Sequence, residues 1–111
     1  MKIKLYDLPK VSTNKFYSSM HWTKRKTLKD NYTLIIHNQF KDILPKTKKY
    51  EVEYLFNFRL RPLDASNCSI MLKMIEDVIF ENDKHNIVEA IKIRSRKNKE
   101  EFVEITITEI N

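Results

Sequence analysis

The spacing of apolar residues changes period five times along this chain of 111 residues, which divides it into six regular elements. Alternation of apolar and polar residues predicts a strand buried on one face, whereas steps of three and four predict an amphipathic helix. The pattern predicts strands at 2–7, 50–60, 87–94 and 102–110, and helices at 23–40 and 65–80. The order β-α-β-α-β-β predicts an α+β fold: a two-layer sandwich in which a mixed sheet carries both helices on one face.

Three of these elements have patterns clear enough to name their buried side chains. The strand at 50–60 is expected to place on one face Tyr50, Val52, Tyr54, Phe56, Phe58 and Leu60. The helix at 23–40 is expected to form its apolar stripe from Leu28, Tyr32, Ile35, Ile36 and either Gln39 or Phe40. The helix at 65–80 is expected to bury Cys68, Met71, Leu72, Ile75 and Ile79. A chain of this length forms one core, so residues 1–111 are expected to make a single domain.

The chain contains no glycine, so its tight turns depend on Asn, Asp and Ser. A glycine-rich loop that cradles phosphate is therefore excluded. The polar segment 95–100 between the last two strands predicts a hairpin turn, in which Asn98 is the residue expected to take a positive φ.

The formal net charge is +6, from 21 Lys and Arg against 15 Asp and Glu, which favours binding to polyanions such as DNA. A bias toward lysine codons would give the same charge without a polyanionic partner. The single cysteine excludes an internal disulfide and any zinc site with several cysteines. No apolar stretch is long enough to span a membrane, and residues 1–7 lack the apolar core of a signal peptide. We therefore expect a cytoplasmic protein.

The start of the helix at 65–80 gathers side chains with possible chemistry. At 100° per residue, one stripe of that helix holds Ser66, Ile70, Lys73 and Asp77. Asp64 lies just before the helix, and the loop after it contains Glu81 and Asp83.

Two interpretations of this cluster remain open. In the structural one, Asp64 or Ser66 caps the helix, Lys73 pairs with Asp77 one turn away, and Asp83 is a turn residue. In the functional one, Asp64 and Asp83 bind Mg²⁺ or Mn²⁺, because hard cations prefer oxygen ligands. Lys73 would then neutralise charge that develops on a phosphate.

Basic and aromatic residues at several places predict contacts with DNA. The candidates are Asn14, Lys15, Trp22, Lys24, Arg25, Lys26, Arg59, Arg61 and Asn67, with a basic turn formed by Arg94, Arg96, Lys97 and Lys99. An aromatic ring such as Trp22 can stack on an unpaired base. The alternatives are that Trp22 packs at the helix start, that the two arginines pair with nearby acids, and that the basic turn is only solvated.

Three stretches, in order, are similar to the RusA-type Holliday junction resolvases. The first is Ser12-Thr13-Asn14-Lys15-Phe16-Tyr17 followed by His21-Trp22-Thr23-Lys24-Arg25-Lys26, which resembles the polar N-terminal segment and basic helix of that family. The second is Asp64-x-Ser66-Asn67 with Lys73 and Asp77, which resembles the Asp-x-Asp-Asn motif. The third is Glu81-Asn82-Asp83, which resembles the acidic loop of the family.

The resemblance implies a small homodimer that binds four-way DNA junctions and cuts two opposing strands with Mg²⁺ or Mn²⁺. Asp64 and Asp83 would be metal ligands, with Ser66 at a third ligand position. Lys73 would neighbour the catalytic base or contact phosphate, and Asp77 would be a supporting acid or a ligand on the same face. Members of this family are encoded by many phages and prophages.

Two departures from the family pattern keep other functions open. Ser66 replaces the second aspartate and brings no charge, and Asp77 lies about 16 Å from it along a helix. The lysine also comes about one turn later than in the family. The alternatives are a junction-binding protein with weakened catalysis and a small basic module that binds an acidic protein. An increase in DNA cutting by the Ser66→Asp variant would favour the nuclease over both of these alternatives.

Overall fold

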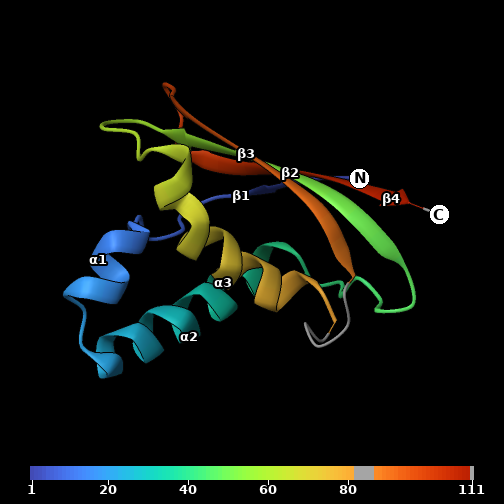
Figure 1. The fold of residues 1–111 in the computed structure, drawn as a ribbon, viewed down its shortest axis with the longest axis horizontal. Helices are drawn as coiled ribbons and strands as arrows, with labels where there is room; N and C mark the ends of the chain where they lie inside the picture. The colour runs from blue at the N-terminus through green and yellow to red at the C-terminus, as the bar shows by residue number, and fades with distance from the viewer. Residues whose placement is uncertain (82–86, 111) are drawn as a thin grey trace.

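The computed structural model describes residues 1–81 and 87–110. In chain order its elements are β1 (Lys2–Leu5), α1 (Thr13–Ser18), α2 (Trp22–Gln39), β2 (Lys49–Phe58), the 3₁₀ turn η1 (Ala65–Cys68), α3 (Ser69–Ile79), β3 (Val88–Lys97) and β4 (Phe102–Ile110). The strands form one mixed sheet in the order β1-β4-β2-β3, and the helices all lie on one side of it (Figure 1). The α+β class and the mixed sheet with helices on one face are confirmed.

The predicted hairpin between the last two strands is wrong. β3 and β4 both pair with β2, which separates them: β3 runs parallel to β2 and β4 runs antiparallel to it. The connection between them passes the end of β2, where the N–H of Asn98 donates to the carbonyl of Phe58 at 2.8 Å. Among the described residues only Asp7 has a positive φ, at 65°, so the expectation for Asn98 is also wrong.

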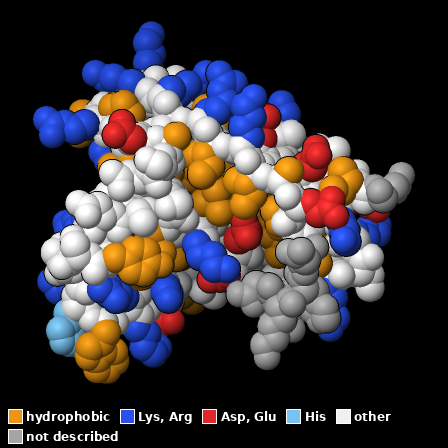
Figure 2. Space-filling model, viewed as in Figure 1, with side chains coloured by type: hydrophobic (Ala, Val, Ile, Leu, Met, Phe, Trp, Pro, Cys, Tyr) orange, Lys and Arg blue, Asp and Glu red, His pale blue; other side chains and the backbone are white. Residues whose placement is uncertain are grey.

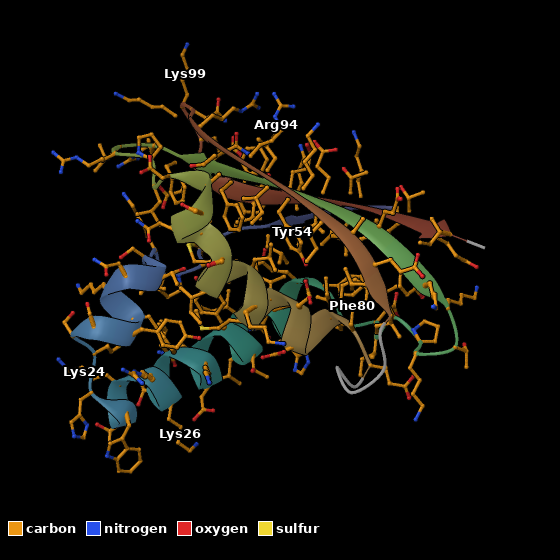
Figure 3. The ribbon with its side chains drawn as sticks, viewed as in Figure 1. Lys24, Lys26, Tyr54, Phe80, Arg94 and Lys99 are labelled. Carbon is orange, nitrogen blue, oxygen red and sulfur yellow. The ribbon has the colours of Figure 1, made fainter. Side chains whose placement is uncertain are left out.

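The core lies between β2 and the helices, as the sequence pattern predicts. Five apolar residues of β2 are buried, namely Tyr50, Val52, Tyr54, Phe56 and Phe58, whereas Leu60 beyond the strand end is 72% exposed. All five residues predicted for the buried stripe of the helix at 65–80 are buried, of which Cys68 ends η1 and the other four lie on α3. Figure 3 shows Tyr54 and Phe80 on the side of the sheet that faces the helices. Burial of side chains of this size stabilises the fold by about 1.5–3 kcal/mol each.

Helix α1 lies inside residues 8–21, a segment that the sequence pattern predicts to be irregular. Ser12 caps it, because its hydroxyl accepts a hydrogen bond from the N–H of Lys15 at 3.0 Å. Phe16 is the single buried side chain of its six residues. Six residues hold too few apolar positions to reveal a helical period, and Phe16 attaches this turn to the core.

Candidate functional site

The turn that contains Asp64 is fixed by hydrogen bonds to its backbone. The hydroxyl of Ser95 on β3 donates to the carbonyl of Leu63. The carbonyl of Asp64 accepts from the N–H of Asn67 at 2.8 Å and from the thiol of Cys68 at 3.6 Å. The position of Asp64 is therefore set by β3 on one side and by η1 on the other.

Helix α1 supplies the cap of α3. The hydroxyl of Thr13 accepts a hydrogen bond from the N–H of Ile70 at 2.9 Å and lies 3.1 Å from the carbonyl of Asn67, to which it can donate. The N–H of Asn14 donates to the side-chain oxygen of Asn67 at 3.3 Å. Asn14 and Asn67, both expected to contact DNA, thus contact each other, and Asn14 and Lys15 lie on a helix rather than in a loop.

The carboxylate of Asp64 is consequently not used as a cap. Asp64 occupies the N-cap position of η1 but makes no capping hydrogen bond through its side chain, and the side chain of Cys68, which precedes α3, makes none either. The expected cap by Asp64 or Ser66 is therefore wrong, because Thr13 fills that role from another element. Asp64 and Ser66 are both exposed to solvent.

The residues present are compatible with Mg²⁺ or Mn²⁺ but do not form a complete ligand set by themselves. Within residues 1–81 and 87–110, no three His, Cys, Asp or Glu side chains are grouped to hold a metal ion. Asp83, the second expected ligand, lies outside the described residues. Glu81 accepts a hydrogen bond from the N–H of Lys46 at 2.9 Å. Because Mg²⁺ usually combines one or two carboxylates with several waters, Asp64 fits as one of those carboxylates.

Lys73 and Asp77 form the expected pair one turn apart on α3, with 3.3 Å between the ammonium and the carboxylate and about half of each side chain exposed. The predicted stripe is interrupted, because Ile70 is only 3% exposed and belongs to the core. Asp77 is not placed to act together with Asp64 in the way that an aspartate at position 66 would be. The 3₁₀ turn η1 rises about 2.0 Å per residue, so the two positions are farther apart than an α-helix would place them.

The ammonium group of Lys10 lies near this site, which the sequence pattern did not indicate. Its ammonium donates to the carbonyl of Arg61 and lies 5.2 Å from the centre of the Phe58 ring. Lys10 therefore lies beside the connection from β2 to Asp64. A single lysine in an irregular segment carries no signal of such a position, because the contact joins residues far apart in the chain.

One basic surface lies at the end of the sheet where β3 leads into β4, and we call it the basic rim. Its exposed members are Arg59, Arg61, Arg96, Lys97 and Lys99. Figure 2 shows Lys and Arg side chains gathered along this edge of the molecule, and Figure 3 shows Arg94 and Lys99 pointing away from the helices. Because Arg59 and Arg61 follow β2 directly, the rim adjoins the Asp64 turn.

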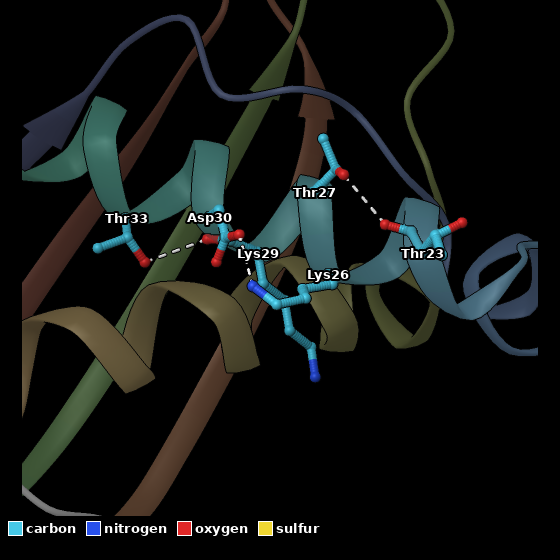
Figure 4. Close-up of polar contacts among 6 residues, drawn as sticks. All are labelled: Thr23, Lys26, Thr27, Lys29, Asp30 and Thr33. Atoms are coloured by element: carbon cyan, nitrogen blue, oxygen red, sulfur yellow. Dashed lines mark hydrogen bonds and ion pairs between the residues drawn. The ribbon is translucent and has the colours of Figure 1, made fainter.

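A second basic surface lies where α1 meets α2. Lys15, Lys24 and Lys26 are exposed, and Trp22 is 67% exposed, so the packing of Trp22 at the helix start is not observed. Lys26 forms an ion pair with Asp30 at 3.0 Å (Figure 4). Such an exposed pair contributes at most about 1 kcal/mol, so a phosphate can compete with it for Lys26.

Arg25 differs from its neighbours because it joins α1 to α2. It is half-buried and donates to the carbonyl of Tyr17 at 3.0 Å. Its guanidinium also lies 5.4 Å from the centre of the Phe16 ring, within the range of a cation–π contact. The guanidinium of Arg25 thus contacts other residues of the protein, whereas Lys15, Lys24 and Lys26 are exposed to solvent.

Comparisons with known proteins do not identify a relative. No protein-family model matches this sequence, and a search of curated proteins finds no match to it. Within the described parts of the chain, no helix has the length and apolar character needed to cross a membrane.

Proposed function

We propose that this protein is a divalent-metal-dependent, structure-selective endodeoxyribonuclease that resolves four-way DNA junctions by paired hydrolysis of phosphodiester bonds. The observation that carries the proposal is the Asp64 carboxylate. It is exposed and forms no cap, yet its backbone is fixed by β3 and η1. A carboxylate held at a defined place and open to solvent is suited to bind a cation together with its waters.

In this proposal Asp64 and Asp83 hold Mg²⁺ or Mn²⁺, with the hydroxyl of Ser66 beside them. The bound ion would polarise the scissile phosphate and lower the pKa of the attacking water. Lys73 would stabilise negative charge that develops on the phosphate. Asp77 would hold the ammonium group of Lys73 on the exposed side of α3 through the 3.3 Å contact between them.

The two basic surfaces support DNA as the substrate. The basic rim adjoins the Asp64 turn, and the exposed lysines near Trp22 lie on α1 and in the first turns of α2. We propose that both contact phosphates of branched DNA, and that a twofold homodimer presents two Asp64 sites to the junction, as paired cutting requires. The protein would then act in DNA recombination and repair in the cytoplasm of a bacterial or phage-infected cell.

The decisive experiment compares cleavage of a labelled four-way junction and a linear duplex, in Mg²⁺ or Mn²⁺. Wild type is expected to make paired cuts in the junction alone. Asp64→Asn is expected to abolish cutting and retain binding, because it removes a ligand charge without changing side-chain size. Asp42→Asn, an exposed aspartate between α2 and β2, is the matched control and is expected to cut normally. Undiminished cutting by Asp64→Asn would refute the role of Asp64.

A second candidate function is a junction-binding protein without catalysis, and the exposed serine at position 66 favours it. A serine hydroxyl brings no charge to a metal site, and the number of charged ligands sets the affinity for the cation. This candidate predicts tight junction binding that is indifferent to Mg²⁺ and no cutting in either metal. Ser66→Asp is expected to raise cutting if the protein is a weakened nuclease and to change nothing if it only binds.

A further inference from the structure

Trp22 is a large aromatic side chain that the fold leaves in solvent. It is the only tryptophan of the chain, lies at the first position of α2 and is 67% exposed. The ring of His21 lies 5.8 Å from it, and His21 is itself fixed, because its Nδ1 accepts from the N–H of Thr23 at 3.3 Å. The indole is thus presented beside an anchored ring instead of contributing to the core.

The charge around Trp22 is entirely positive along the chain. Residues 8–29 contain no acid and six cations, which are Lys10, Lys15, Lys24, Arg25, Lys26 and Lys29. A shallow groove of about 310 Å³ runs along α2 and is lined by Met20, Thr23, Lys24, Thr27, Leu28 and Asn31, whereas Trp22 lies on another side of this helix. The surface at Trp22 therefore combines an exposed aromatic ring with cations that are near it in the chain.

We infer that this corner of α1 and α2 binds unpaired nucleotides of DNA, with Trp22 stacked on a base and Lys24 and Lys15 paired with the neighbouring phosphates. Stacking is available to every base once it leaves the duplex, and the cations match the charge of the backbone. A second copy of this chain is a poorer occupant, because it would bring the same positive surface to the contact. The inference rests on the proposed function for the choice of DNA as the polyanion.

Helix α1 connects this corner to Asp64 through direct contacts at both ends. Arg25 of α2 donates to the carbonyl of Tyr17, and Thr13 caps α3 just after the Asp64 turn. The corner is therefore held in a fixed relation to Asp64. Unpaired nucleotides bound at Trp22 would orient the branch point of a DNA substrate relative to the site of cutting.

The fluorescence of Trp22 reports on this corner alone, because the chain has no other tryptophan. Oligo(dT) and a junction with unpaired bases at its centre are expected to quench it, whereas a fully paired duplex at equal phosphate concentration is expected not to. Trp22→Ala is expected to weaken oligo(dT) binding about 5- to 150-fold, and Trp22→Phe is expected to restore most of it. Affinity for these variants is measured by anisotropy of labelled DNA.

Leu34→Ala is the matched control, since Leu34 is 65% exposed on the same helix. It is expected to leave the affinity unchanged, and circular dichroism checks the fold of each variant. Equal affinity for duplex and oligo(dT) without quenching, or an equal loss in Leu34→Ala, would overturn the inference. So would equal quenching by a poly-glutamate peptide, which would make the corner a site for acidic proteins. The nuclease proposal is tested separately, by the loss of cutting in Asp64→Asn. Nucleotide binding at Trp22 and DNA cutting at Asp64 can therefore be refuted independently of each other.

Discussion

Thr13 lies on α1, but its hydroxyl accepts the N–H of Ile70 at the start of α3, 57 residues away. Without this hydroxyl, the N–H of Ile70 would have no hydrogen-bond partner, and the folded state would lose about 1–2 kcal/mol of stability. Thr13→Val is therefore expected to lower the free energy of unfolding by that amount, as measured with urea. Thr27→Val, which removes an exposed hydroxyl bond within α2, is expected to change it by less than about 0.5 kcal/mol. Equal losses in both variants would contradict the tertiary cap.

The buried side chains of Tyr32 and Tyr54 are expected to make the stability of the protein depend on pH in the alkaline range. Burial raises the pKa of Tyr32 and of Tyr54 above the ordinary value of 10.0, and Glu76 raises that of Tyr54 further. The folded state keeps both phenols neutral at a pH at which the unfolded chain loses these protons. The free energy of unfolding is therefore unaffected by the two tyrosines below about pH 10 and decreases as the pH rises above it. The expected loss is up to about 1.4 kcal/mol per pH unit for each tyrosine. Tyr32→Phe is expected to make this slope smaller in urea titrations from pH 9 to 11, because it removes one of the phenols whose pKa is raised.

At the scale of the element, β2 is the strand on which the sheet is built. It pairs on both sides, whereas β1 and β3 are edge strands, and Phe56 in its centre is fully buried. Phe56→Ala is therefore expected to cost about 3–5 kcal/mol of unfolding free energy. Ile91→Ala on β3, where the side chain is 46% exposed, is expected to cost less than half of that. A larger loss for Ile91 in denaturant unfolding would show that the free edge of β3 is covered in solution.

At the scale of the whole molecule, the net charge of +6 predicts DNA binding that weakens steeply with salt. A plot of the logarithm of the DNA association constant against the logarithm of the salt concentration has a negative slope. The magnitude of this slope is expected to decrease by about 0.9 for each duplex phosphate contact that is removed. Arg59→Gln with Arg61→Gln is expected to reduce it by about 1.8 for junction DNA, measured by anisotropy. Lys48→Gln at the opposite end of β2 is the control, since Lys48 pairs with Glu109 at 3.3 Å. An unchanged slope in the double variant would remove the basic rim from the DNA interface.

The sequence by itself determined the main elements and the faces that they bury, because periods of two and of 3.6 residues are local properties of a chain. The buried residues of β2 and α3 follow from it directly. It also indicated Asp64 and the Lys73–Asp77 pair, the latter because those residues lie one helical turn apart.

Only the tertiary structure decided which strands are neighbours and which polar groups satisfy one another. β3 and β4 are close in sequence but are separated by β2, because the apolar ladder of β2 takes a partner on both sides. The cap from Thr13 and the partial burial of Arg25 likewise depend on how α1 packs, and the exposure of Trp22 is also decided by the tertiary structure. Contacts between segments 50 or more residues apart leave no period in the sequence, so the bond from Ile70 to Thr13 could not be predicted from it.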